Sequence, residues 1–212
     1  MTIKKFSEDE KITADCYAKM IKEHKNGPQI VGWSKKGQLL RFQILSEIGD
    51  LNNKTILDVG YGLGDFYDFL TKKKGIKIKK YLGIDINSVM IEKAKKKYPK
   101  AEFQVIDLLG SPIEESFDYV FESGTFGVDT PNWKELTSEL LVKMFKISKI
   151  GIGANFLSDF IPFKKTKGIH YNDPAEILNF ANKKLNLRLI LRHDYLPHDF
   201  TIFIYKKPFN IF

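Results

Sequence analysis

Residues 56–65, Ile-Leu-Asp-Val-Gly-Tyr-Gly-Leu-Gly-Asp, decide the fold of this chain. An apolar strand leads to Asp58, and three glycines follow at alternate positions before a helix-like stretch. Glycine is needed where the backbone turns tightly over a ligand, because a side chain there collides with the ligand or forbids the backbone angles. A dinucleotide-binding loop has glycines at positions one, three and six, whereas here position six is Asp65. The stretch therefore predicts a nucleoside-binding loop of a different kind after a buried strand.

Three further apolar strands end in an acidic residue, at Asp85, Asp107 and Glu122. In nucleoside-binding α/β folds, a carboxylate at the end of the second strand accepts hydrogen bonds from ribose hydroxyls. The carboxyl ends of parallel strands share one edge of the sheet, where ligands bind. We therefore expect these acids and the glycine loop to form one ligand site.

The alternation of expected elements predicts an α/β fold. The expected strands are 55–59, 80–85, 102–106, 117–122, 149–155, 187–193 and 200–206, and the expected helices are 8–25, 34–48, 64–73, 88–97, 132–147 and one beginning at Pro174 after the capping residue Asp173. The last two strands are separated only by Asp194–Asp199, which is too short for a crossover, so they must be antiparallel. We expect a single domain over 1–212, with a helical cap over 1–50 and a Rossmann-like core over 51–212.

The composition is that of a globular protein. The chain has 212 residues, 43% of them hydrophobic and 17 of them phenylalanine, which is enough for one sizeable core. No apolar run is long enough to span a membrane, and the N-terminus lacks the apolar segment of a signal peptide. The single cysteine, Cys16, excludes an internal disulfide and fits a reducing cytoplasm. We expect a cytoplasmic protein.

The net charge of +8 raises the question of a nucleic-acid partner. Only three of the 34 basic residues are arginine, the residue whose planar fork nucleic-acid surfaces favour. The lysines fall mostly in helix ends such as 72–80 and 93–100, where they suit solvent and the helix dipole. We therefore expect a solvated surface and no nucleic-acid partner.

The glycine pattern, with an acid two residues before the first glycine, resembles motif I of the class I S-adenosylmethionine-dependent methyltransferases. The stretch Gly32-Trp33-Ser34-Lys35-Lys36-Gly37-Gln38-Leu39-Leu40-Arg41-Phe42 and the segment Arg192-His193-Asp194-Tyr195 resemble parts of a group of small bacterial stand-alone members. The resemblance covers the chain from about residue 50. It implies S-adenosylmethionine as cofactor and a seven-stranded, mostly parallel sheet of order 3-2-1-4-5-7-6, with strand 7 antiparallel.

The resemblance also implies roles for residues at the matching positions. Gly60, Gly62 and Gly64 let the backbone approach the methionine and ribose, and Asp58 orients the loop or meets the amino group. Asp85 takes the ribose, Ile86 packs on adenine, Asp107 takes the adenine amino group and Leu108 its face. Glu122 borders cofactor and acceptor, Trp33 stacks on or shields the cofactor, and Arg41 pairs with the methionine carboxylate. Tyr61 stands where the family often has a small residue; it either closes over the cofactor, narrows the acceptor entrance or occupies a tolerated variable position.

Histidine is the natural candidate for a general base, because its imidazole titrates near neutral pH. His170, His193 and His198 follow late strands and are the candidates. Segments 124–132, 156–173 and 194–199 are expected to surround the acceptor.

The leading hypothesis is methyl transfer to an O or N atom of a small-molecule acceptor. The alternatives are a methyltransferase that acts on RNA or protein through the lysine-rich surface, and a cofactor-binding module without catalysis. The segment Glu122-Ser-Gly-Thr125 lacks the Asn/Asp-Pro-Pro-Tyr motif of amino-methylating nucleic-acid enzymes, and no metal-ligand set is evident. The sequence carries no expectation of oligomeric state.

Overall fold

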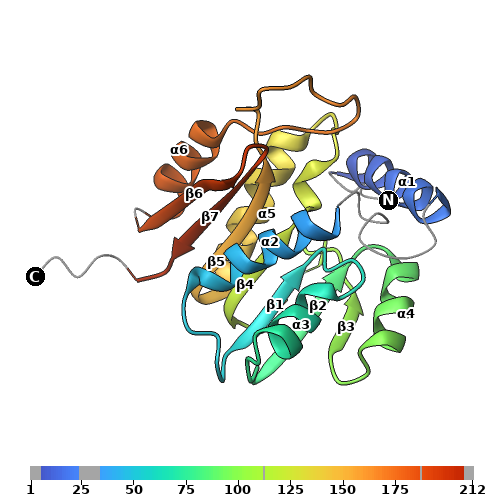
Figure 1. The fold of residues 1–212 in the computed structure, drawn as a ribbon, viewed down its shortest axis with the longest axis vertical. Coiled ribbons are helices and arrows are strands. Elements are labelled where there is room, and N and C mark those ends of the chain that lie inside the picture. The colour runs from blue at the N-terminus through green and yellow to red at the C-terminus, as the bar shows by residue number, and fades with distance from the viewer. Residues whose placement is uncertain (1–5, 24–33, 112, 187, 208–212) are drawn as a thin grey trace, which may run out of the picture.

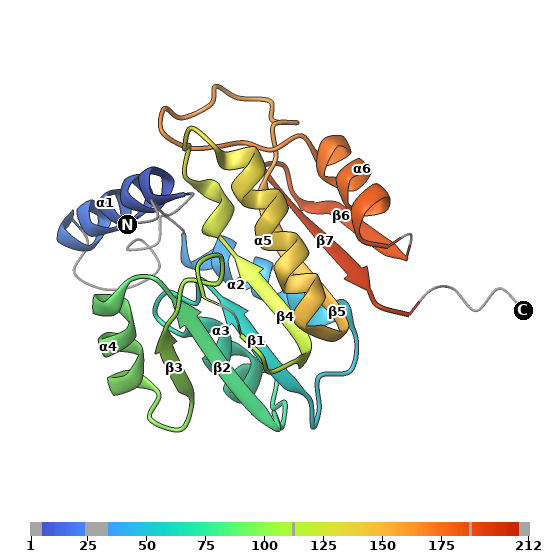
Figure 2. The same cartoon turned by 180° about the vertical axis from the view of Figure 1, so that it is seen from behind.

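The computed structural model of the chain describes residues 6–23, 34–111, 113–186 and 188–207. Within these residues, seven strands form one sheet with helices on both faces (Figures 1 and 2). The strands are β1 (Thr55–Val59), β2 (Lys80–Asp85), β3 (Glu102–Val105), β4 (Phe117–Ser123), β5 (Ser148–Leu157), β6 (Leu189–Leu196) and β7 (Asp199–Tyr205). The helices are α1 (Ser7–Glu23), α2 (Lys35–Leu45), α3 (Asp65–Asp68), α4 (Ser88–Lys97), α5 (Trp133–Ile147) and α6 (Pro174–Lys184), with short helical turns η2 (Ser46–Ile48), η3 (Phe69–Lys73) and η4 (Thr125–Gly127).

The strand order is β3-β2-β1-β4-β5-β7-β6, and β7 runs antiparallel to both of its neighbours. The other pairings, from β3 to β5, are parallel. This confirms the predicted fold class and strand order. Because the β6–β7 connection is short, the sheet must close on a hairpin rather than on another crossover.

Two apolar layers hold the sheet between its helices. On one face, α2, α3 and α4 pack Leu45, Phe66 and Ile91 against the sheet. On the other face, α5 and α6 pack Leu141 and Ala181 against it. Central strands such as β1 are therefore buried on both sides, which explains why their sequences are nearly continuous apolar runs.

The boundaries of two predicted elements differ from the structure. The helix expected over 64–73 is a short α3 followed by a π-helical turn, η3. β6 continues to Leu196, which pairs with Asp199, so Pro197 and His198 alone connect the hairpin. A register shift after Arg192 lets the chain keep pairing further than its sequence suggested. Tyr195 consequently belongs to an edge strand and not to the expected loop.

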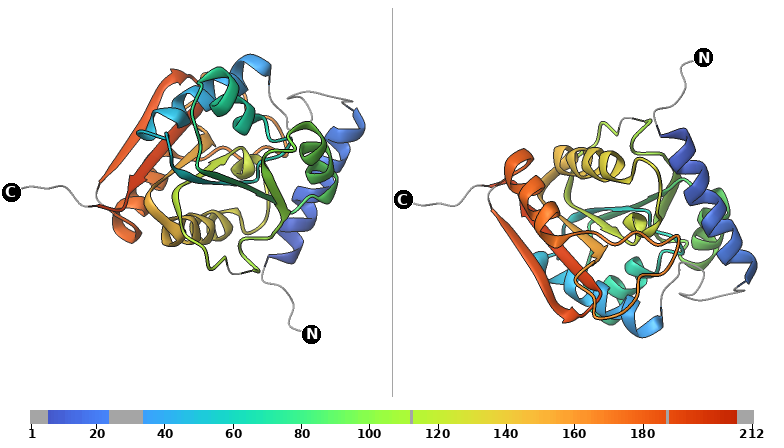
Figure 3. Two further views of the ribbon diagram at one scale, coloured as in Figure 1. Left: turned by 90° about the horizontal axis from the view of Figure 1, so that it is seen from below. Right: turned by 90° about the horizontal axis from the view of Figure 1, so that it is seen from above.

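Helix α1 lies across the edge of the sheet at which the parallel strands end (Figures 1 and 3). Its Asp9 is buried and accepts hydrogen bonds from the backbone and side chain of Asn132, at 2.9 and 3.0 Å. Burial alone raises the pKa of Asp9, but the hydrogen bonds from Asn132 and Thr130 outweigh it and hold the pKa below its ordinary value. Asp9 is therefore a charged anchor that fastens α1 to the start of α5. Among the described helices, none is long and apolar enough to cross a bilayer.

Candidate active site

A cavity opens at the carboxyl-terminal edge of the sheet, between the tips of the parallel strands and α1. It is lined by Glu10, Thr13, Ala14, Tyr17, Gln38, Phe42, Asp58, Val59, Gly60, Tyr61, Gly62, Leu63, Asp65, Phe66, Ile84, Asp85, Ile86, Asn87, Met90, Ile106, Asp107, Leu108, Leu109, Ser123, Gly124, Thr125, Leu136 and Leu140. The glycine loop and the ends of β2 and β4 thus meet at one site, as expected for a ligand of an open α/β sheet.

The glycine loop is held in a left-handed backbone conformation. Gly60, Gly62 and Gly64 have φ values of 70°, 58° and 74°, which residues with a side chain rarely adopt. A Cβ atom on Gly60 would lie 2.1 Å from Thr125 Oγ1. The first glycine is therefore required both by its backbone angles and by the close approach of the loop that follows β4.

Asp85 ties the glycine loop to the end of β2. Its carboxylate accepts the Gly62 backbone N–H at 3.1 Å and the Asn87 N–H at 2.9 Å. Burial raises the pKa of Asp85, and these backbone hydrogen bonds oppose that rise. Each carboxylate oxygen has more than one acceptor position, so Asp85 can hold the loop and still accept hydroxyls from a ligand in the cavity.

Two further carboxyl groups are buried beneath the cavity. Asp58 is 2% exposed and accepts a hydrogen bond from the Tyr81 hydroxyl, and burial raises its pKa to about 7. Glu122 is fully buried and accepts the Thr125 backbone N–H, and burial raises its pKa to about 8. Glu122 is absent from the lining, so it supports the loop at the cavity edge and does not face the ligand space.

These raised pKa values predict that the ligand-free protein loses stability as the pH rises. The folded state keeps protons on Asp58 and Glu122 at pH values where the unfolded chain has released them, so folding binds protons. This contribution is complete below the ordinary carboxyl pKa values and is lost as the pH passes about 7 to 8. The free energy of unfolding, measured by urea denaturation, should fall by on the order of 1–2 kcal/mol from neutral to mildly alkaline pH. Glu122→Gln, which has no proton to lose, should flatten the profile; an unaltered slope would contradict the assignment.

The residues predicted to hold adenine lie at the ends of β2 and β3, on one side of the cavity. Ile86 is 39% exposed, and Leu108 is largely buried beside it. Asp107 accepts the backbone N–H groups of Leu109 and Gly110 at 2.8 and 2.7 Å and so shapes the turn after β3. The structure thus brings these three predicted residues together at the cavity, where Asp107 also has a structural task that the sequence did not reveal.

Tyr61 packs into the core on the edge of the cavity. Its ring centroid is 4.7 Å from that of Phe103, and a Cβ on Gly83 would lie 2.8 Å from the Tyr61 ring. Tyr61 is 6% exposed. The aromatic residue in the glycine loop is therefore accommodated by a glycine on the neighbouring strand β2.

Arg41 is not where the sequence analysis expected it. Its guanidinium Nη2 lies 2.7 Å from both carboxylate oxygens of Asp199, and both side chains are buried. Arg41 lines a small second pocket with Gly124 and Asn155 and is absent from the lining of the main cavity. Its expected contact with the methionine carboxylate is thus replaced by a buried ion pair. Trp33, the other predicted residue from this stretch, lies outside the described residues.

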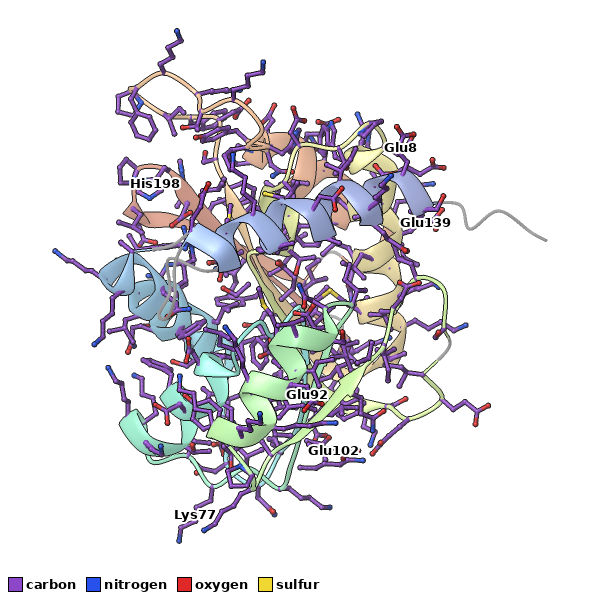
Figure 4. All side chains as sticks on the ribbon, turned by 90° about the vertical axis from the view of Figure 1, so that its right-hand side faces the viewer. Glu8, Lys77, Glu92, Glu102, Glu139 and His198 are labelled. Atoms are coloured by element: carbon purple, nitrogen blue, oxygen red, sulfur yellow. The ribbon has the colours of Figure 1, made fainter. Side chains whose placement is uncertain are left out.

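The three candidate histidines are also absent from the cavity lining. His170 stacks on Trp133, with ring centroids 3.7 Å apart, and burial lowers its pKa despite Asp129 at 3.4 Å. His193 packs edge-on against Phe200 within the hairpin. Figure 4 shows His198 on the other side of α1 from Glu92 of α4. The hairpin and the β5–α6 loop thus hold these histidines away from the lining of the cavity, and their assignment as a general base stays a prediction.

The sequence analysis missed the contribution of α1. Glu10, Thr13, Ala14 and Tyr17 line the cavity from one face of this helix. The Tyr17 hydroxyl donates to the Gly124 carbonyl at 3.2 Å, and burial raises its pKa, so it remains a donor at neutral pH. The spacing 10, 13, 14 and 17 is that of a single helix face, which is the signal that would have identified these residues.

The cavity is acidic, although the chain as a whole is basic. Its lining includes the carboxylates Glu10, Asp58, Asp65, Asp85 and Asp107. Among the described lining residues, none is lysine, arginine or histidine. The described part of the chain also holds no group of three or more His, Cys, Asp or Glu residues suited to a metal ion. The local charge therefore suits a ligand that carries positive charge.

Comparisons with known proteins address the same region. A family model described as a methyltransferase domain matches residues 56–143. A Mycobacterium tuberculosis protein described as a methyltransferase is 27% identical over 161 residues, covering 72% of this chain and 93% of that protein. The solved structure of magnesium protoporphyrin IX methyltransferase from Synechocystis PCC 6803 with bound S-adenosylmethionine has a TM-score of 0.68 at 14% identity, covering 94% of this chain and 97% of that chain.

A further structural neighbour is phosphoethanolamine N-methyltransferase 1 from Haemonchus contortus, in complex with phosphoethanolamine and S-adenosylhomocysteine. Its TM-score is 0.68 at 14% identity, covering 95% of this chain and 50% of that chain. At such identities the neighbours show the fold, while the family model spans the glycine loop and the acid-ended strands β1 to β4. The residues that line the cavity thus fall mainly in a segment that is similar to a methyltransferase domain, on a fold that the chain shares with S-adenosylmethionine-dependent methyltransferases.

Proposed function

We propose that this protein transfers the methyl group of S-adenosylmethionine to a nitrogen or oxygen atom of a small-molecule acceptor. The observation that carries the proposal is the acidic cavity at the strand tips, in which Asp85 and the Gly60–Gly64 loop face α1. We infer that residues 51–212 form the catalytic core of a single domain and that the first 50 residues form its cap. Bound at this site, S-adenosylmethionine would supply an electrophilic methyl group to the acceptor lone pair, and the proton of the methylated acceptor would pass to water.

The cofactor roles proposed for the lining residues follow from where they lie. The positively charged sulfonium and ammonium groups of the cofactor are attracted to the carboxylates of the cavity. Asp85 is placed for the ribose hydroxyls, because its carboxylate is fixed by two backbone N–H groups. Ile86, Asp107 and Leu108 form the surface for adenine beside it. The sulfonium would then lie toward Ser123–Thr125 and α1, where the acceptor must enter.

The chemistry of the lining favours an acceptor that needs no strong base. In-line methyl transfer depends largely on positioning the acceptor and excluding water. No described lining residue is histidine, lysine or arginine, so the cavity has neither an imidazole base nor a cation for an acceptor phosphate or carboxylate. A neutral amine, whose lone pair is already available, suits such a site better than a hydroxyl, whose proton must be removed as the methyl group transfers.

A small acceptor also fits the cavity better than a macromolecule does. α1 lies over the strand tips, and one face of this helix lines the cavity. The lysines of segment 72–80 lie at the opposite end of the molecule, as the labelled Lys77 shows in Figure 4. Two of the fold neighbours act on small molecules, a porphyrin and phosphoethanolamine. These observations favour the small-molecule hypothesis over an RNA or protein substrate.

The experiment that tests the proposed function is a methyl-transfer screen. Purified protein is incubated with S-adenosylmethionine and separate panels of amines, phenols, alcohols, carboxylic acids and short RNAs, and S-adenosylhomocysteine is quantified. The expected result is turnover above the acceptor-free rate with an amine or hydroxyl compound. Turnover confined to RNA, or cofactor binding with no turnover in any panel, would contradict it.

Tyr17→Phe is expected to weaken acceptor use while leaving cofactor affinity nearly unchanged. The change removes the hydrogen bond from Tyr17 to Gly124 that joins α1 to the loop after β4. Such a hydrogen bond contributes about 0.5–1.5 kcal/mol, so the acceptor KM should rise about 2- to 10-fold. Tyr195→Phe is the matched control, because Tyr195 bonds Thr201 at 2.8 Å away from the cavity lining. An equal effect of both variants on KM would contradict a specific role for Tyr17.

A further inference from the structure

The loop between β5 and α6 displays two aromatic rings and three lysines to solvent. Phe160 and Phe163 are 59% and 49% exposed. Lys164, Lys165 and Lys167 follow and are all exposed. We refer to residues 160–167 as the Phe-Lys loop; it protrudes at the top of the molecule in Figures 1 and 4.

This loop is pinned at both ends, so its display of side chains is a fixed feature of the fold. At its neck, the Asn172 N–H donates to the Leu157 carbonyl at 2.7 Å, and the Asp159 N–H donates to the Asn172 carbonyl at 3.0 Å. Its returning half is bonded to the segment after β4, with the His170 N–H donating to the Gly127 carbonyl at 3.1 Å. Residues 160–163, which carry the exposed rings, are thus held away from the core. Their side chains are apolar enough to be buried.

The aromatic neighbours of the two rings are histidines of the β6–β7 hairpin. Phe160 and Phe163 meet the edges of His193 and His198, at centroid distances of 6.1 and 6.0 Å. A pair of exposed aromatic rings on one loop leaves apolar surface in water, which marks an interaction site more often than an isolated exposed residue does. The adjoining lysines give this apolar surface a positive rim, and Asp159 lies 3.9 Å from Lys165 in an ion pair.

Exposed aromatic rings next to lysines are typical of a protein surface that binds an anionic membrane. Rings enter the boundary between headgroups and acyl chains, while lysines reach the phosphates with their flexible stems. RNA fits less well, because its recognition favours the planar fork of arginine, and this loop has none. We propose that the Phe-Lys loop docks the protein reversibly on an anionic lipid bilayer.

The position of the loop connects docking with the cavity. Just beyond the loop, His170 and Gly168 form backbone hydrogen bonds with Gly127 and Asp129. These two residues follow Ser123–Thr125 at the cavity edge. A bilayer at the Phe-Lys loop would therefore lie on the same side of the molecule as the cavity. This inference does not rest on the proposed methyl transfer, since lipid binding is measurable without turnover.

The test is co-sedimentation of the full chain with vesicles of phosphatidylcholine alone or mixed with phosphatidylglycerol. We expect binding to the mixed vesicles that weakens as salt is raised. Lys164→Gln/Lys165→Gln/Lys167→Gln should lower partitioning about 100-fold, since each lysine near an anionic surface contributes about five-fold. Phe160→Ser/Phe163→Ser should lower it about ten-fold, because binding scales with the apolar area inserted.

Matched controls separate the loop from overall charge and hydrophobicity. Lys73→Gln/Lys77→Gln/Lys79→Gln removes the same charge from exposed positions at the opposite end of the molecule and should leave partitioning nearly unchanged. Val105→Ser/Val142→Ser removes exposed apolar side chains elsewhere and should also have little effect. Unchanged affinity for S-adenosylhomocysteine in the loop variants would show that they remain folded.

Three results would overturn the proposal. The first is no binding to mixed vesicles at low salt, and the second is an equal loss in the control lysine variant. The third is binding of single-stranded RNA, with the same lysine dependence, by a protein that does not bind vesicles. The last outcome would assign the loop to nucleic acid.

Discussion

Replacing Arg41 with methionine is expected to lower the free energy of unfolding by about 3–5 kcal/mol, because it leaves the buried Asp199 carboxylate without its cation. Arg41 and Asp199 are 2% and 0% exposed, and Arg41 Nη2 lies 2.7 Å from both carboxylate oxygens. His198 Nε2, at 3.8 Å, is too distant to replace that contact. Urea denaturation at neutral pH measures the loss.

Two further variants show whether burial is the cause. Arg41→Met/Asp199→Leu removes both charges and should recover most of the stability, since an apolar pair can replace a buried ion pair. Arg192→Met breaks surface contacts to Glu47 and Asp194 at 2.9 and 2.7 Å and should cost less than about 1 kcal/mol. If Arg41→Met lowered the free energy of unfolding no more than Arg192→Met does, the buried ion pair would contribute no more to stability than the surface contacts.

Replacing Asp85 with alanine is expected to weaken S-adenosylmethionine binding by about 1–3 kcal/mol, roughly 5- to 150-fold. The change removes the acceptor proposed for the ribose hydroxyls. It also removes the acceptor that fixes the Gly62 N–H at 3.1 Å, so the glycine loop loses part of its bound shape. Isothermal titration calorimetry at neutral pH measures the difference directly.

The control for this variant is Asp118→Ala. Asp118 resembles Asp85 in accepting a backbone N–H, that of Thr55 at 2.8 Å, but it lies at the other end of the strands and outside the cavity lining. Its loss should lower stability and leave cofactor affinity unchanged. If the Asp85 variant and the wild type bound S-adenosylmethionine with equal affinity, the proposed role of Asp85 in cofactor binding would be wrong.

The antiparallel hairpin and the position of the ligand cavity could be predicted from the sequence because their signals are local, whereas the strand order was implied by the family resemblance. Glycines at positions 60, 62 and 64 require positive φ values, and the structure has them. Acids at strand ends mark the edge where the parallel strands finish, and Asp58, Asp85 and Asp107 line one cavity there. The short link before Asp199 fixed the antiparallel hairpin. Each of these inferences depends on residues close together in the chain.

The residues that were misplaced depend on contacts between distant segments. Arg41 forms an ion pair with Asp199, 158 positions away, and no local sequence pattern predicts that pair. Tyr195 was expected in the link between the last two strands, but the register of the β6–β7 pairing extends β6 past it to Leu196. α1 was recognised as a helix, yet nothing in its periodicity states that Tyr17 reaches Gly124, 107 positions away. Tertiary packing decides which face of such an element meets the site.

The most direct test of the central claim is calorimetric titration of the purified wild-type protein with S-adenosylmethionine and S-adenosylhomocysteine. The acidic cavity between the Gly60–Gly64 loop and α1 predicts saturable binding of each ligand at one molecule per chain. No saturable binding of either ligand would contradict the account, and the sheet architecture would then stand without its assigned cofactor.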